Sequence, residues 1–184
     1  MTDAKPYHHG DLRRAMLAAA VAAIDEHGPS ALSLRDLARR AGVSHAAPAH
    51  HFGDKVGLLT ALATEGFDLL ADQLELVRGR GIVELGVSYV RFATDHRAHF
   101  EVMFRPDLYR ADDPAVAAAG ERAYSLLAEG IGVEAAEDGS ALLAAWSLVH
   151  GFATLWNAHI LPPELVADPS AGARAIAEIF ARRL

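Results

Sequence analysis

Residues 33–52 read SLRDLARRAGVSHAAPAHHF, and this stretch decides how the rest of the chain is interpreted. Ser33 and Asp36 have the spacing that caps a helix start, and leucines and alanines follow at helical intervals. Gly42 supplies a left-handed residue that ends a helix, and Ser44 offers a second N-cap shortly after it. The spacing therefore predicts a short helix, a tight turn and a second short helix, as in a helix-turn-helix.

The side chains of this stretch suit contact with DNA. Small and polar groups in the first turn of the second predicted helix would let that helix approach base edges in a major groove. Free backbone amides at both helix starts, with hydroxyl and cationic side chains nearby, favour phosphate binding. The predicted DNA-binding residues are Ser33, Arg35, Ser44, His45, Ala46, Ala47, His50, His51 and Lys55. The motif alone also allows two short helices packed in an all-α core with no DNA role.

The context of the motif resembles a known family. The order of LRDLARRAGVS, a short helix ending in His-Phe, and Asp-Lys before a leucine-rich helix closely resembles the TetR family of bacterial transcriptional regulators. PYHHGDLR near the N-terminus, HAAP after the turn and WSLVHG at residues 146–151 are similar to the branch with a WHG-type C-terminal domain. The resemblance implies a homodimer whose C-terminal helices bind a small-molecule effector. One position departs from the family, because Ala49 stands where most members have an aromatic residue, usually Tyr, that contacts a phosphate.

The distribution of charge agrees with a DNA-binding N-terminal part. The chain of 184 residues has a net charge of −7. Residues 1–55 hold seven Lys/Arg and six Asp/Glu, a balance of +1, whereas the remainder holds ten and eighteen, a balance of −8. The weakly basic end can face DNA while the acidic body does not. We expect modest affinity with a clear dependence on salt.

Several classes of protein are not indicated. No run of about 18 apolar residues suggests a membrane span, and MTDAKPYHHG lacks the apolar core of a signal peptide. With no cysteine there is no disulfide framework, so we expect a cytoplasmic protein. There is no Gly-rich phosphate loop, nucleophile elbow or HExxH motif, so we expect neither an enzyme nor a cofactor.

A histidine-based metal site is a weaker alternative. His45, His50 and His51 invite a zinc hypothesis, and so do His8 and His9 near the N-terminus. No cysteine or pair of histidines four residues apart supports it, so we expect no metal site. A metal-responsive regulator is kept as a further alternative function.

The rest of the chain predicts an all-α fold with two domains. About ten mobile residues should precede a first helix capped by Asp11. We expect residues 1–55 to form a three-helix DNA-binding domain of the helix-turn-helix type, and residues 56–184 a C-terminal helical bundle for ligand binding and dimerisation. Asp54 should cap a helix of about 23 residues that joins the two. The further predicted helices cover residues 82–95, 99–105, a segment from Pro114, about 138–159, and a segment from Pro169.

Aromatic and apolar side chains of the C-terminal part are candidates for an effector cavity. Such residues at helical spacing also suit a solid core, and it is the family resemblance that favours a cavity. Polar anchors would come from His96, His99, His150 or Asn157. The predicted ligand-binding residues are Phe67, Leu70, Tyr89, Phe92, His96, Phe100, Met103, Phe104, Tyr124, Trp146 and His150. A mostly apolar lining predicts a hydrophobic or aromatic effector.

The last two predicted helices are the candidates for dimerisation. Two such helices from each subunit can form a four-helix interface, which the resemblance also implies, although a monomer remains possible from the pattern. The predicted interface residues are Phe152, Leu155, Trp156, Ile176 and Phe180. The sequence thus predicts a repressor that binds a pseudo-palindromic operator in double-stranded DNA and is released by its effector. The alternative is a small-molecule-binding helical dimer with weak or lost specific DNA binding.

Overall fold

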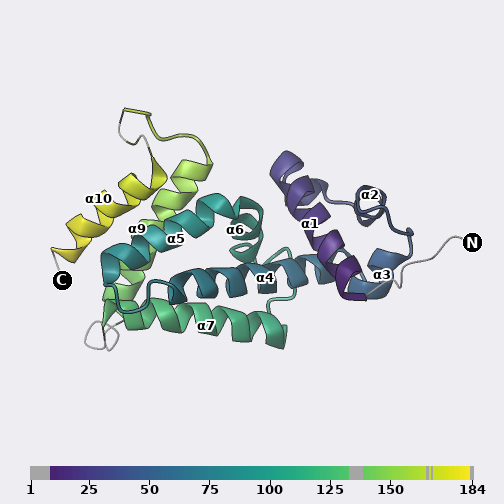
Figure 1. The fold of residues 1–184 in the computed structure, drawn as a ribbon, viewed down its shortest axis with the longest axis horizontal. Coiled ribbons are helices and arrows are strands. Elements are labelled where there is room, and N and C mark those ends of the chain that lie inside the picture. Colours follow the sequence, from purple (N-terminus) through teal and green to yellow (C-terminus); the bar gives the residue numbers. More distant parts are fainter. Residues whose placement is uncertain (1–8, 133–138, 165, 167, 183–184) are drawn as a thin grey trace, which may run out of the picture.

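The protein is all-α, as the sequence predicts. The computed structural model describes residues 9–132, 139–164, 166 and 168–182, and within these ranges the regular structure is helical (Figure 1). Most of the predicted mobile N-terminus and the predicted helix start near residue 138 lie outside the described residues. The first helix begins at His9, so Asp11 lies inside it and is not its N-cap.

Three helices and a short 3-10 turn form the head of the molecule. These elements are α1 (His9–His27), η1 (Pro29–Ala31), α2 (Leu34–Arg40) and α3 (Ala47–Phe52). Leu12, Met16, Leu17 and Ile24 form a buried stripe on α1. Because α1 contacts α2, α4 and α6, this stripe holds the short helices rigidly against the rest of the molecule.

One long helix joins the head to the body. Helix α4 (Lys55–Glu75) begins as predicted, because the Asp54 side chain accepts a hydrogen bond of 2.7 Å from the amide of Gly57. It ends at Glu75 and is followed by turns, a few residues before the predicted end. A helix of this length spans roughly 30 Å. It contacts α1 and α3 near one end and α5, α6 and α7 further along.

The body consists of the remaining helices. They are α5 (Ile82–Asp95), α6 (Arg97–Met103), α7 (Pro114–Ile131), α9 (Ser140–Asn157) and α10 (Pro169–Ala181). Asp113 and Asp168 cap α7 and α10 through hydrogen bonds of 2.9 and 2.7 Å to Ala115 N and Ala171 N. Helix α6 begins two residues earlier than predicted. Helix α5 ends at Asp95, and His96 alone separates it from α6.

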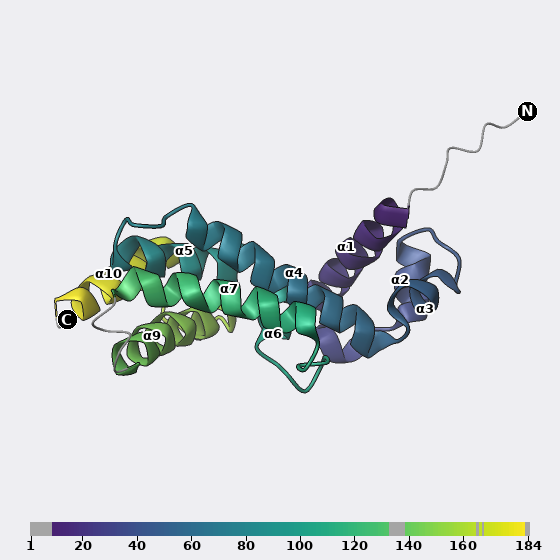
Figure 2. The ribbon, with the colours of Figure 1, turned by 90° about the horizontal axis from the view of Figure 1, so that it is seen from below.

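The molecule is elongated, with the head at one end and α10 at the other (Figures 1 and 2). Helix α7 runs beside α4 in both views, and α10 packs on α5 and α9. Helix α6 lies between the head and the rest of the body and contacts α1, η1, α4 and α5. Within the described ranges, no helix is long and apolar enough to cross a membrane.

Candidate functional site

The start of α2 differs from the predicted capping arrangement. Ser33 occupies the N-cap position, but its hydroxyl makes no capping hydrogen bond. The Asp36 carboxylate instead accepts hydrogen bonds from Arg39 at 2.6 Å and Arg40 at 2.8 Å. These charge-assisted bonds replace the predicted bond to the helix start and lower the pKa of Asp36. The Ser33 hydroxyl has no hydrogen-bond partner among the described residues.

The second helix of the motif starts later than predicted. Helix α3 begins at Ala47, so Ser44 is not its N-cap, and His45 and Ala46 lie in the turn before it. Pro48 explains the shift, because it has no amide hydrogen to donate to the Ser44 carbonyl and is favoured in the first helical turn. The Ser44 carbonyl accepts instead from Ala47 N at 3.0 Å. Gly42 has the predicted left-handed conformation, with φ of 65°.

Most of the predicted DNA-binding side chains lie on the surface of the head. Exposed residues are Ser33, Arg35, Ser44, His45, Ala46 and His50, whereas Ala47, His51 and Lys55 are half-buried. Arg35 has no ion pair with any residue that the structure describes, unlike Arg39 and Arg40. The Lys55 ammonium donates to the Ser30 carbonyl at 2.9 Å, which positions it between η1 and the start of α4. Ala49 is exposed on α3.

The loop between α6 and α7 holds the start of α4. The Arg110 guanidinium contacts both oxygens of Asp54, at 2.9 and 3.0 Å, and its backbone amide donates to the Thr60 hydroxyl at 3.1 Å. In addition, the Tyr109 hydroxyl donates to the carbonyl of Met103, at the end of α6, at 2.9 Å. This loop therefore connects the end of α6 to the residues immediately after α3.

Two of the cavities in the body hold most of the predicted ligand-binding residues. The first, called here the inner cavity, has a volume of about 170 Å³ and lies between α4, α5, α6, α7 and α9. Six predicted ligand-binding residues line it, together with Gly120, Ala123 and Leu127, which were not predicted. The six are Phe67, Leu70, Tyr89, Phe104, Tyr124 and Trp146. The small residues on α7 gave no signal in the sequence, because an alanine or glycine on a packed helix face is ordinary core.

The second, called here the outer cavity, has a volume of about 350 Å³ and lies between α6 and the second half of α9. Phe100, Phe104 and His150 line it as predicted. Arg97, Glu101, Thr154, Asn157 and Ala158 also line it; of these only Asn157 was considered from the sequence. Phe104 belongs to both cavities and separates them.

A hydrogen-bonded triad of Trp146, Tyr89 and His150 stands between the cavities. Trp146 Nε1 donates to the Tyr89 hydroxyl at 3.0 Å, and that hydroxyl lies 2.9 Å from His150 Nδ1. Tyr89 is fully buried, which raises the pKa of its hydroxyl, and burial lowers the pKa of His150. At neutral pH the triad is therefore uncharged.

The other predicted ligand-binding residues lie away from both cavities. Phe92 and Met103 are buried in the core, and Met103 packs against α4 at Gly66. His96 is half-buried, stacks on Phe92 at 5.3 Å between ring centroids, and has a pKa lowered by burial. The helical spacing that suggested these residues cannot tell a cavity wall from solid core.

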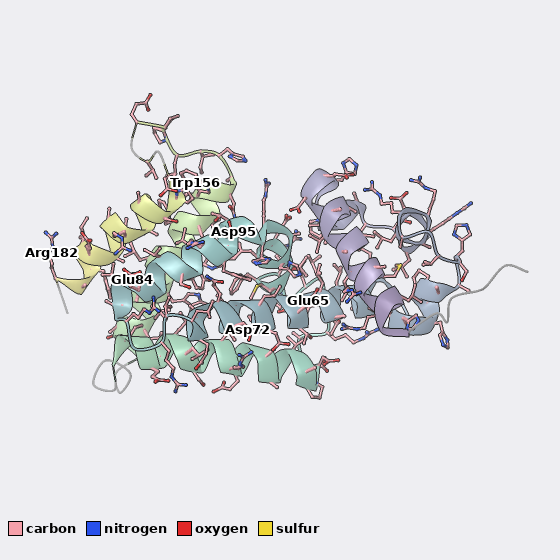
Figure 3. The ribbon with its side chains drawn as sticks, viewed as in Figure 1. Glu65, Asp72, Glu84, Asp95, Trp156 and Arg182 are labelled. Carbon is pink, nitrogen blue, oxygen red and sulfur yellow. The ribbon has the colours of Figure 1, made fainter. Side chains whose placement is uncertain are left out.

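Helix α6 is held against α4 by a partly buried polar contact. His99 Nε2 lies 3.2 Å from a carboxylate oxygen of Glu65, and this hydrogen bond lowers the pKa of Glu65. Figure 3 shows Glu65 on the part of α4 that lies between the body and α1. A Cβ at Gly66 would lie 3.1 Å from the Cβ of His99, so this glycine allows the two helices to approach closely.

Several large apolar side chains are exposed on α9 and α10, and they are called here the apolar face. Leu143, Leu148 and Leu155 on α9 are 63%, 36% and 41% exposed, and Ile179 on α10 is 62% exposed. Among the predicted interface residues, Trp156 (labelled in Figure 3), Ile176 and Phe180 are half-buried.

Phe152 is buried within the chain. A Cβ at Gly172 of α10 would lie 2.5 Å from its ring. Its side chain therefore packs α9 onto α10 and is not presented to a partner.

The histidines that the structure describes in the head form no metal-binding group of three ligands. Among the residues that the structure describes, no three His, Asp or Glu side chains are placed to hold one metal ion. His50 and His51 lie edge to face at 5.5 Å between ring centroids. His8, of the second pair considered in the sequence, lies outside the described residues, as does the side chain of His9.

Two family models match the chain. Residues 16–62 match the model described as "Bacterial regulatory proteins, tetR family". Residues 82–180 match the model described as "Tetracyclin repressor-like, C-terminal domain". The residues between the two matches belong to α4 and the turns after it, so the boundary predicted at residues 55 and 56 lies within the first match. A search of curated proteins gave no match.

Solved structures have the same fold. A protein of unknown function from Rhodococcus sp. RHA1 is 35% identical, with a TM-score of 0.80 over 98% of this chain and 99% of that one. The TetR family transcriptional regulator PfmR from Thermus thermophilus is 21% identical, with a TM-score of 0.70 over 91% and 97%. The TetR-like regulator LfrR from Mycobacterium smegmatis, solved in complex with proflavine, is 21% identical, with a TM-score of 0.65 over 95% and 97%.

Proposed function

Because the chain belongs to the TetR family of bacterial transcriptional regulators, we propose that it is a ligand-responsive repressor of the following kind. It binds a pseudo-palindromic operator in double-stranded DNA as a homodimer, and a small hydrophobic or aromatic effector releases it. One observation carries the proposal: α6 lines the outer cavity with Phe100 and Phe104 and also contacts α1 and η1 of the head. A ligand in the cavity therefore acts on a helix that supports the DNA-binding residues.

In this proposal the head divides its contacts between phosphates and bases. Ser33, Arg35 and Lys55 surround the helix starts and carry groups that bind phosphate oxygens. His45 is exposed in the turn directly before α3, where its imidazole can contact a base edge in the major groove. Because α3 is short, this turn and the first helical residues would supply most of the base contacts.

The coupling between ligand and DNA would pass through the C-terminal half of α6 and the loop after it. Glu101 lies near Gly28, with a carboxylate oxygen 4.0 Å from the position of a Cβ on that glycine. The loop after α6 holds Asp54 through Arg110. A ligand that occupies the outer cavity and displaces α6 would therefore move the head in two places. Its effect is limited to the difference in its affinity for the two arrangements.

The apolar face of α9 and α10 supports a dimer. Exposed apolar patches of this kind mark interaction surfaces. Gly151 lies on this face with nothing within 4 Å of its Cβ position, which would let the α9 helices of two subunits approach closely. A two-fold axis through this face would place two heads on the same side of a DNA duplex, one for each half-site.

The first experiment is selection of bound duplexes from a random pool, followed by titration of the winner at two salt concentrations. We expect a palindromic winner bound at least about a thousandfold tighter than random DNA. A set of aromatic compounds is then screened against this complex. The proflavine complex of LfrR supports an aromatic effector for this fold. Operator affinity that stays unchanged at saturating ligand, for every compound that binds, would contradict the proposed release.

A ligand-binding dimer without specific DNA binding is the second candidate. Ala49 favours it, since α3 lacks an aromatic hydroxyl at this exposed position, and the weak basic surplus of residues 1–55 points the same way. Under this alternative the selection yields no palindrome, and all binding disappears at high salt. If Ala49→Tyr then restores a specific winner, the head has kept its fold and lost only a phosphate contact.

A further inference from the structure

We propose that His150 presents a fixed N–H donor to the outer cavity, so that the effector is an aromatic or apolar molecule that brings a neutral hydrogen-bond acceptor, such as a ketone. This inference rests on the proposed function, because it specifies the ligand of the same site. Its basis is the direction of the hydrogen bonds in the triad of Trp146, Tyr89 and His150.

The direction of these bonds follows from the chemistry of the three side chains. The indole of Trp146 can only donate, so the Tyr89 oxygen accepts its N–H. The Tyr89 hydroxyl then has one hydrogen of its own, and its neighbour at 2.9 Å is His150 Nδ1. Because Tyr89 is fully buried, a hydroxyl hydrogen without an acceptor would be strongly disfavoured. His150 Nδ1 must therefore accept, which places the imidazole hydrogen on Nε2.

The other protonation states of the His150 imidazole are disfavoured. Burial lowers the pKa of His150, which opposes a second proton on the ring at neutral pH. A proton on Nδ1 would also face the Tyr89 hydroxyl, which would then have to turn its own hydrogen elsewhere. The two hydrogen bonds of the triad thus fix the tautomer of His150. Nε2 has no protein partner among the residues that the structure describes.

The surroundings of His150 define the rest of the ligand. The rings of Phe104 and Phe100 lie 4.5 and 5.0 Å from the imidazole, between centroids, and form apolar walls of the outer cavity. The Thr154 hydroxyl donates to the carbonyl of His150, and the Asn157 amide donates to the carbonyl of Ala93. Both side chains therefore already have a partner within the protein. The donor on His150 therefore stands beside aromatic walls, and it suits a carbonyl attached to an aromatic body.

Charged groups at the cavity do not favour a charged ligand. Arg97 and Glu101 both line the outer cavity, and their opposite charges offset each other. An uncharged acceptor also avoids the cost of removing an ion from water to reach His150. A ketone, lactone or quinone fits these conditions, whereas a hydrocarbon of the same shape would leave the His150 donor without a partner.

The first test reads the tautomer directly. NMR of the full-length protein with ¹⁵N-labelled histidine at pH 7.5 should show His150 as a single tautomer protonated on Nε2. Tyr89→Phe removes the hydroxyl that fixes Nδ1, so His150 should return to a mixture of the two tautomers. His159→Asn, at the exposed end of α9, is the matched control and should leave the His150 signals unchanged. A charged ring or protonation on Nδ1 in the unmodified protein would overturn the inference.

The second test measures selectivity with two probes of the same shape. Acetophenone carries the carbonyl, and α-methylstyrene replaces its oxygen with a methylene group. We expect acetophenone to bind about fivefold more tightly, the size of effect that one neutral hydrogen bond gives. The preference should vanish in His150→Phe and persist in His159→Asn. Equal affinities, or binding of neither probe, would overturn the proposed ligand class.

The proposed repressor function and the proposed donor on His150 can be contradicted independently of each other. A protein that selects the ketone but does not change its operator affinity on binding would contradict the ligand-responsive repressor and leave the donor on His150 intact. If a hydrocarbon releases the protein from its operator as readily as the ketone of the same shape, the proposed repressor function stands. The proposed hydrogen-bond donor on His150 is then contradicted.

Discussion

In the head, two polar side chains that the proposed function uses are unpaired among the described residues, whereas in the body three polar side chains bind one another. Ser33 and Arg35 in the head are exposed and have no side-chain partner among the described residues. In the body, Trp146, Tyr89 and His150 are hydrogen-bonded to one another around the fully buried Tyr89. In the proposed function the head would offer these groups to DNA, whereas the body would keep one directed donor for a small ligand. We therefore expect charge to supply affinity in the head and a fixed hydrogen bond to supply selectivity in the body.

The largest effect is expected at the exposed face of the body. Leu155→Glu places a carboxylate on the α9 face proposed to pair with a second subunit, and buried unpaired charge is strongly unfavourable there. We expect a monomer in light scattering and a loss of operator affinity of about a hundredfold, because the two heads no longer act as one bivalent unit. Ala118→Glu, exposed on α7, is the control. A Leu155→Glu dimer of unchanged stability would exclude this face as the interface.

The junction between head and body should tolerate no side chain at Gly57. A Cβ there would overlap the backbone oxygen of Phe52 and lie 2.9 Å from the Arg110 guanidinium. We expect Gly57→Ala to lower the free energy of unfolding by about 1–3 kcal/mol, as overpacking does. Gly120→Ala is the matched helical control, since nothing lies within 4 Å of its Cβ position, and it should raise stability by about 0.5–1 kcal/mol. Urea denaturation measures both; equal effects would contradict the close contact.

Within the head, the loss of a base contact and the loss of a phosphate contact should affect DNA binding differently. His45→Ala is expected to relax specificity at one base position per half-site, at a cost of about 1–3 kcal/mol for the preferred base. Arg35→Ala and Lys55→Ala should instead weaken all sequences alike and reduce the salt slope by about one unit each. Titrations of the operator and its single-base variants at several salt concentrations separate the two. An equal loss of affinity for the operator and all its single-base variants in His45→Ala would contradict a base-reading role for His45.

The smallest effect is the dependence of stability on pH, which should come from the body. Burial lowers the pKa of His150 and of His96 below the ordinary 6.5, so the unfolded chain binds protons more readily than the folded one. Stability should therefore fall as the pH is lowered from about 7.5 through 6.5 toward the pKa values of the folded state. Thermal melts should show a weaker fall in His150→Gln and an unchanged fall in His45→Gln, a histidine exposed in the head. Rising stability over this range would contradict the assignment.

Paired carboxylates contribute in a different pH range. Hydrogen bonds from Gly57 N and His99 lower the pKa of Asp54 and Glu65, respectively. Stabilisation from a carboxylate with a lowered pKa is complete above its ordinary pKa of about 4 and is lost as the pH falls through the folded value. Melts between pH 7.5 and 5.5 therefore report the histidines without interference from these groups.

Much of the head could be predicted because its signals are local. The left-handed Gly42 and the Asp54 cap are set by residues within a few positions of each other, and both are confirmed. The errors are also local: Pro48 delays the start of α3, and Asp36 binds the two following arginines in place of the helix start. In each case two local preferences competed, and the sequence pattern did not indicate which was stronger.

By itself, the sequence determined the all-α class, the helix-turn-helix and most helix positions, because capping residues and helical periodicity act over one or two turns of chain. Only the tertiary structure decided which aromatic residues line a cavity. Phe92 and Phe104 have equally suitable sequence surroundings, yet Phe92 is buried in the core while Phe104 separates two cavities. The triad that directs His150 joins residues about sixty positions apart. Contacts of that range depend on how whole helices pack, and no local preference encodes them.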